Sequence, residues 1–186
     1  MLKMGLSAAV LAAMVTYGQA NAQDTATAKG EELRSWSAKI NDARRRFEVL
    51  KAFHGMAVLD HETQLVWQQS PDVTFRSFAI SSGFCNTLNV DDRLGWRMPT
   101  LQELASLVDP SVHPGPTLPP GHPFSNVLAD SAYWSSTAGA SNPELQYIVS
   151  FQLGEVSVTS NVPSGPGGLP VWCVRGGLGS GVPSSQ

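Results

Sequence analysis

The two cysteines, Cys85 and Cys173, are the residues whose chemistry the sequence constrains most closely. No CxxC pair and no nearby Cys/His spacing accompanies them, which argues against zinc ligation. In an oxidising compartment an isolated pair is most simply a disulfide, and closing so long a loop is worth about 4–5 kcal/mol in the chain-entropy model. The alternative is that Cys85 acts as a nucleophile, which requires both thiols to be free.

The remaining polar residues do not assemble a catalytic or metal-binding motif. No two of the four histidines have the HExxH or i, i+4 spacing of zinc ligands. His113 and His122 flank a proline-rich loop and are candidate ligand contacts, with ordinary surface histidines as the alternative. The Asp91–Asp92 pair lacks EF-hand spacing, and Ser135–Ser136 has no identifiable base. We therefore expect a protein that is not an enzyme and that holds no metal or cofactor.

Arg44, Arg45 and Arg46 form the densest positive cluster of the chain. Cations at the end of a helix interact favourably with its dipole, so a structural role would explain them. The alternative is a patch that binds a polyanion. The formal charge of −3 becomes −4 if residues 1–22 are removed, since Lys3 is their only charged residue (11 Lys+Arg against 15 Asp+Glu). This acidic balance argues against nucleic-acid binding.

The first 22 residues have the pattern of a secretory signal peptide. A positive Lys3 precedes the apolar run 4–15, and "ANA" at 20–22 matches a cleavage site. The alternative, a membrane anchor, needs about 20 apolar residues. We therefore expect a bacterial protein that is periplasmic or secreted, with no membrane span.

Residues 23–45 are expected to hold a flexible segment and an N-terminal helix, because apolar residues recur at spacings of three and four over 31–47. The spacing also fits a short heptad pattern. A single helix laid on the domain and a homo-oligomer formed through this helix are therefore both open. Residues 178–186, which are rich in Gly, Ser and Pro, are predicted to form a disordered tail.

Residues 46–177 are predicted to form one globular domain. Apolar alternation, apolar periodicity and turn residues predict strands over 46–50, 131–137 and 170–177, hairpins over 56–68 and 145–160, and helices over 74–88 and 101–108. Six prolines exclude regular structure from 110–125. The 110–125 and 160–168 loops are the segments in which we expect ligand contacts.

The segment 95–104, "GWRMPTLQEL", contains a helix start. Thr100 and Glu103 match the capping box T-x-x-E, and Pro99 favours an extended entry. If 95–98 is a strand, Arg97 alternates away from Trp96, and its guanidinium can brace backbone carbonyls or a carboxylate. We therefore expect Arg97 to belong to the scaffold.

Six blocks of the sequence together resemble a bacterial exported domain family, named for the C-terminal domain of the Legionella collagen-like protein, Lcl. The blocks are "VLDHETQLVWQQ" (58–69), "FCNTL" (84–88), "GWRMPTLQELASLVD" (95–109), "YWSST" (133–137), "VSFQLGEV" (149–156) and "WCVRGG" (172–177). The resemblance covers roughly residues 46–177. It implies a non-enzymatic binding or adhesion module, and glycosaminoglycan binding as a trimer is associated with the family's founding member.

The resemblance also implies roles for individual residues. Cys85 falls in the family's "FC" helix and Cys173 in its "CVR" strand, a placement that fits a structural bridge. The residues that carry the structural motif are Trp96, Arg97, Pro99, Thr100, Glu103, Trp134, Trp172 and Arg175.

Two of these blocks, "WRMPTLQEL" and "CVRGG", also resemble segments of formylglycine-generating (sulfatase-modifying) enzymes. That likeness implies an α+β fold with a C-type-lectin-like core of antiparallel strands, two helices and long irregular loops, preceded by the N-terminal helix. Those enzymes use two cysteines in the C-terminal part of the domain, whereas this chain has only Cys173 there. An enzyme of that group and a structural subunit of a surface assembly are the alternatives to a carbohydrate-binding or adhesion module.

Overall fold

The computed structural model describes residues 40–161 and 168–177. The chain divides into two units, Met1–Ser37 and Ala38–Gln186, and every described residue belongs to the second. The predicted signal peptide, most of the predicted N-terminal helix and the predicted tail lie outside the described residues. Among the residues that are described, no helix is long and apolar enough to cross a membrane.

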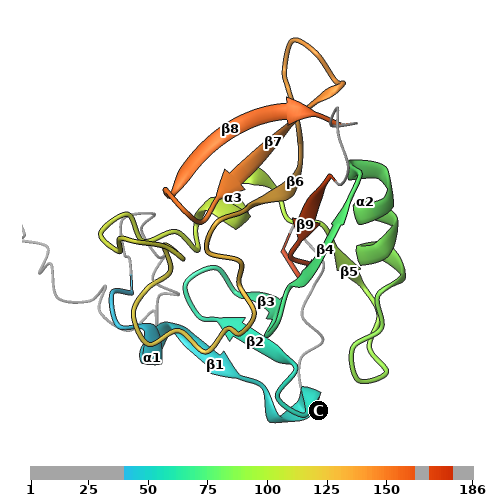
Figure 1. Cartoon of the computed structure of the whole chain (residues 1–186). Helices are drawn as coiled ribbons and strands as arrows, with labels where there is room; N and C mark the ends of the chain where they lie inside the picture. Colours follow the sequence, from blue (N-terminus) through green and yellow to red (C-terminus); the bar gives the residue numbers. More distant parts are fainter. Residues whose placement is uncertain (1–39, 162–167, 178–186) are drawn as a thin grey trace, which may run out of the picture. The chain divides into compact units, whose positions relative to one another are not determined.

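Five antiparallel strands form the largest sheet of this unit, which lies in the lower half of Figure 1. Their order is β1 (Phe47–Val49), β2 (Ala57–Asp60), β3 (Leu65–Gln68), β10 (Val174–Arg175) and β5 (Trp96–Arg97). The predicted 56–68 hairpin is confirmed, with Ala57 opposite Gln68 and Asp60 opposite Leu65. Strand β10 therefore reaches this sheet from the far end of the chain.

Two smaller sheets complete the strand architecture of the described residues. One consists of β6 (Ala132–Ala138), β7 (Leu145–Ser150) and β8 (Glu155–Ser160), and the other pairs β4 (Asp72–Arg76) with β9 (Leu169–Val171). The predicted 145–160 hairpin is confirmed, because Ser150 lies opposite Glu155 on either side of the turn at Gly154. The fold is therefore α+β, as predicted.

The helices are shorter than the sequence patterns predict. They are α1 (Ala43–Arg46), the 3-10 helix η1 (Lys51–Phe53), α2 (Phe78–Thr87) and α3 (Leu101–Ala105). The described end of the helix predicted over 31–47 is only partly helical. Residues 40–42 are not helical, Asp42 is the N-cap of α1 at Ala43–Arg46 and accepts from Arg44 N, and Phe47 enters β1. The helix predicted over 74–88 is wrong in its first turn, since residues 74–76 belong to β4 and pair with the β9 region.

The single strand predicted over 170–177 is divided between two sheets. Trp172 and Cys173 separate β9 from β10, and both side chains are fully buried. Figure 1 shows β9 beside β4 and α2, while β10 pairs with β3 and β5. This short stretch therefore joins the two sheets at the centre of the core.

The proline-rich segment has no regular structure, as predicted, and it is packed into the core. Leu118 and Phe124 are buried, and the Phe124 ring lies 4.8 Å from that of Trp172, centroid to centroid. The segment is also held by backbone hydrogen bonds from Thr117 N to Phe151 O (2.8 Å) and from Asp109 N to Thr117 O (2.7 Å). Much of the 110–125 segment is thus a structural part of the domain that packs against its hydrophobic core.

Candidate functional site

Arg97 is held between helix α3 and the C-terminal end of the domain. Its Nη1 donates to Glu103 Oε2 at 2.8 Å and its Nη2 to Glu103 Oε1 at 2.6 Å. Nη2 also donates to the backbone oxygen of Gly176 at 2.7 Å. Trp96, its neighbour on β5, points into the core. Arg97 therefore braces the scaffold and offers little to a ligand.

Glu103 is shared between this ion pair and the start of α3. Its Oε2 accepts from the Thr100 amide at 2.8 Å, while its own amide donates to Thr100 Oγ1 at 3.3 Å, which completes a capping box. Burial by itself would raise the pKa of Glu103, but the hydrogen bonds from Arg97 and Thr100 outweigh it and hold the pKa below its usual value.

The tryptophans of the motif serve as buried anchors. Each indole donates to a backbone oxygen: Trp96 to Arg93 at 3.0 Å, Trp134 to Arg76 at 2.9 Å and Trp172 to Gln68 at 2.9 Å. The Pro99 oxygen accepts from Ser136 N at 2.7 Å, which ties the start of α3 to β6. These indoles are covered and do not form a surface on which sugars could stack.

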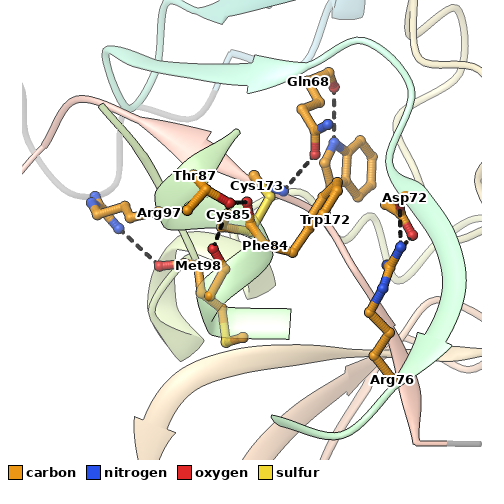
Figure 2. Close-up of a disulfide and its surroundings, with 11 residues drawn as sticks. Gln68, Asp72, Arg76, Phe84, Cys85, Thr87, Arg97, Met98, Trp172 and Cys173 are labelled. Atoms are coloured by element: carbon orange, nitrogen blue, oxygen red, sulfur yellow. Dashed lines mark hydrogen bonds and ion pairs between the residues drawn. A yellow bond between two sulfur atoms is a disulfide. The ribbon is translucent and has the colours of Figure 1, made fainter. Parts of the chain in front are cut away.

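Cys85 of α2 and Cys173 form a disulfide with a Cα–Cα distance of 5.5 Å. Figure 2 shows Gln68 holding the same stretch of chain: its Oε1 accepts from Cys173 N at 2.9 Å and its backbone oxygen accepts from the Trp172 indole. Both sulfur atoms are buried. The cysteines are therefore structural in this oxidised form.

The residues predicted to bind ligand do not share one environment. Arg46 is fully buried against Asp60, so its place in a surface patch is corrected: Nε donates to Oδ1 at 3.0 Å and Nη2 to Oδ2 at 2.8 Å. Arg44 and Arg45 remain exposed on α1, and His113 is exposed. His122 is half-buried and stacks on Phe124, and burial lowers its pKa.

A hollow of about 240 Å³ opens beside the disulfide, between the β2–β3 hairpin and the turn after α2. It is lined by Met56, Gln68, Gln69, Ser70, Asn89, Val90 and Asp91. Within the described residues, neither Gln68 Nε2 nor the Asn89 amide has a hydrogen-bond partner in the protein. Non-glycine residues with positive φ gather at the rim, namely His54 (48°), Asp91 (53°) and Asp92 (59°). Strained backbone of this kind is often associated with function.

A basic cluster adjoins the hollow through Asp91. This carboxylate lies 2.6 Å from His54 Nδ1 through Oδ1 and accepts from Arg93 Nη1 at 2.7 Å through Oδ2. The Arg93 guanidinium carbon lies 4.6 Å from the centre of the Phe53 ring, and that of Arg175 lies 6.0 Å from the same ring. We call Arg93, Phe53 and Arg175 the arginine shelf.

Sequence patterns missed both the hollow and the shelf, because their residues come from four separated segments. The hollow combines residues near 56, 68–70 and 89–91, and the shelf adds Arg175. The local signal in the sequence is the charged turn "NVDDRLG" at 89–95, whose Asp91–Asp92 pair lacks the spacing of a calcium-binding motif. Among the described residues, no group of three His, Cys, Asp or Glu side chains could hold a metal ion.

The arrangement is that of a disulfide-closed α+β domain whose surface hollow is lined by both apolar and polar side chains. The family model for the Lcl C-terminal domain matches residues 56–175, and the chain belongs to that family. No curated protein matches it. Family membership and the disulfide both fit an extracellular location.

Proposed function

We propose that this protein is an exported, non-catalytic module that binds a carbohydrate in the hollow beside the disulfide. The observation that carries the proposal is a pair of amides, Gln68 Nε2 and the Asn89 side chain, which no described residue partners and which lie at a hollow that can hold about one sugar ring. Amide groups supply the donors and acceptors that match sugar hydroxyls, and the exposed Met56 supplies an apolar contact.

Asn89→Ala tests this proposal, with Asn86→Ala as its matched control. Both side chains are exposed, and Asn86 lies on α2 outside the set of residues that line the hollow. Titration of a panel of neutral mono- and disaccharides by NMR should find a ligand whose affinity falls about fivefold in Asn89→Ala and is unchanged in Asn86→Ala. Equal affinities in both variants, or no binding by any sugar, would reject the hollow.

A glycosaminoglycan is the finer possibility, and exposed Arg44 and Arg45 on α1 remain candidate contacts for it. Heparin binding should weaken as salt is raised if these arginines contribute, because their charges are fully solvated. The double variant Arg44→Gln/Arg45→Gln should reduce retention on heparin. Retention that is insensitive to both salt and substitution would remove the α1 patch from the proposal.

The C-type-lectin-like core and assembly through the N-terminal helix also belong to the proposal. The placement of the capping box and Arg97 beside the C-terminal strand supports the former, because these are the segments that carry the likeness to formylglycine-generating enzymes. Light scattering of the mature chain tests the latter, and a monomer at micromolar concentration would reject it. The disulfide supports a role without thiol chemistry.

A further inference from the structure

Arg175 breaks a pattern that the other inward-lying arginines of the described residues follow. Those that are buried or half-buried each have a carboxylate partner: Arg46 with Asp60, Arg76 with Asp72, Arg93 with Asp91 and Arg97 with Glu103. Arg175 is half-buried too, yet no carboxylate or other acceptor in the described part of the chain pairs with it. A partly desolvated charge without a counter-ion is unfavourable unless something else compensates it.

The position of Arg175 leaves its guanidinium accessible from one side. On β10 it lies opposite Val66 of β3 and Trp96 of β5, so it stands between two apolar side chains on one face of the sheet. Its Nε lies beside Gly95, where even an added Cβ would be 3.6 Å away, and Gly95 is exposed. Position 95 therefore supplies no side chain to cover this side of the guanidinium.

Arg93 brings a second guanidinium to the same place. Both arginines lie against the Phe53 ring, and Arg93 uses only Nη1 to contact Asp91. The two guanidinium groups thus have one contacting carboxylate between them, Asp91, which pairs with Arg93. Phe53 holds the guanidinium planes through cation–π contact and so restricts their orientation.

We propose that Arg175 and Arg93 form a binding site for a single oxyanion group, a carboxylate or a sulfate ester, carried by the ligand of the adjoining hollow. Guanidinium groups present paired donors that match the two oxygens of such groups. Asp91 connects the two sites, since it lines the hollow and positions Arg93. The inference rests on the proposed carbohydrate function for the ligand's identity, whereas the oxyanion contact stands on the arginines alone.

The test compares glucose, glucuronate and glucose 6-sulfate in NMR titrations of the wild-type protein, Arg175→Gln and the control Lys51→Gln. Lys51→Gln removes the same charge from an exposed side chain that belongs to neither the hollow nor the arginine shelf. We expect the acidic sugars to bind the wild type about tenfold more tightly than glucose, and Arg175→Gln to remove that preference. Lys51→Gln should retain it. An unchanged preference in Arg175→Gln would overturn the site, and the two acidic sugars show which oxyanion is favoured.

Sodium acetate and sodium sulfate separate this inference from the proposed function. Either salt should shift the Nε–H resonance of Arg175 in the wild-type protein, with chloride at equal ionic strength as the control. If no sugar binds but this shift occurs, the carbohydrate function fails and the oxyanion site stands. If neither anion shifts the resonance, the site is refuted even if Arg175→Gln does not fold.

Discussion

Gly177 lies against the ion pair between Arg97 and Glu103, so the pair and the glycine depend on one another. A Cβ at Gly177 would lie 2.9 Å from Arg97 Nη2 and 3.0 Å from Glu103 Oε1, and the residue has a φ of 74°. A side chain is therefore excluded both by space and by backbone conformation. The Arg-Gly-Gly ending of the last strand provides the room that Arg97 needs.

Glu103→Gln should lower the free energy of unfolding by about 2 kcal/mol, because it removes the charge that Arg97 and the Thr100 amide share. Thr100→Ala should cost about 1 kcal/mol, since only the side-chain cap is lost. Urea unfolding of the oxidised protein measures both values. A Glu103→Gln protein as stable as the wild type would contradict the bracing role of the pair.

Gly177→Ala should destabilise the protein by more than 1 kcal/mol, whereas Gly83→Ala should stabilise it by about 0.5–1 kcal/mol. Gly83 is exposed on α2, and no atom lies within 4 Å of a Cβ built there. The two variants make the same chemical change in opposite environments. Thermal unfolding compares them, and shifts of the same sign would contradict the argument.

Acid should destabilise the fold through Glu103 and Asp72. Burial opposes ionisation of both, but hydrogen bonds from Arg97 and Arg76 respectively leave each pKa below its ordinary value, 4.5 for Glu103 and 3.8 for Asp72. The ionised carboxylates therefore contribute fully to the free energy of unfolding above the ordinary pKa values. That contribution is lost as the pH falls through the lower pKa values of the folded protein. When the free energy of unfolding is measured with urea from pH 6 to pH 2, the Glu103→Gln variant should lose less stability with falling pH than the wild-type protein does.

Asp60→Asn should be among the most damaging polar substitutions, with an expected loss of about 3 kcal/mol, since it removes the carboxylate that accepts two hydrogen bonds from the buried Arg46 and leaves that charge with Glu62 Oε2, 3.6 Å from Nε. Glu155→Gln is the matched control, because Glu155 is exposed on β8 and should change stability by less than about 0.5 kcal/mol. Urea unfolding at pH 7 distinguishes the two. Equal small effects would show that Arg46 finds another partner.

The double variant Cys85→Ala/Cys173→Ala should lose up to about 4–5 kcal/mol, because the bridge links residues 88 positions apart. Reduction of the wild-type protein should give a similar loss once denaturant exposes the buried sulfur atoms. Mass spectrometry after alkylation under denaturing, non-reducing conditions should find no free thiol. Two alkylated cysteines would contradict the bridge and reopen thiol chemistry.

The local patterns of the chain predicted those elements whose boundaries depend on neighbouring residues. The capping box at Thr100 and both hairpins were predicted correctly, because alternation, turn residues and i, i+3 spacing act over a few positions. The predicted helix over 74–88 failed in its first turn for the opposite reason. Strand β4 forms because a partner from residues 169–171 lies beside it.

The sequence by itself determined an α+β domain, the pair of cysteines and the need for Arg97 to find an acceptor. Only the tertiary structure decided that Arg46 is buried, that 170–177 serves two sheets, and that no carboxylate of residues 40–161 or 168–177 pairs with Arg175. The hollow and the arginine shelf arise where segments distant in sequence meet. Such contacts depend on which strands pair and which faces are covered, and no local pattern of residues encodes that choice.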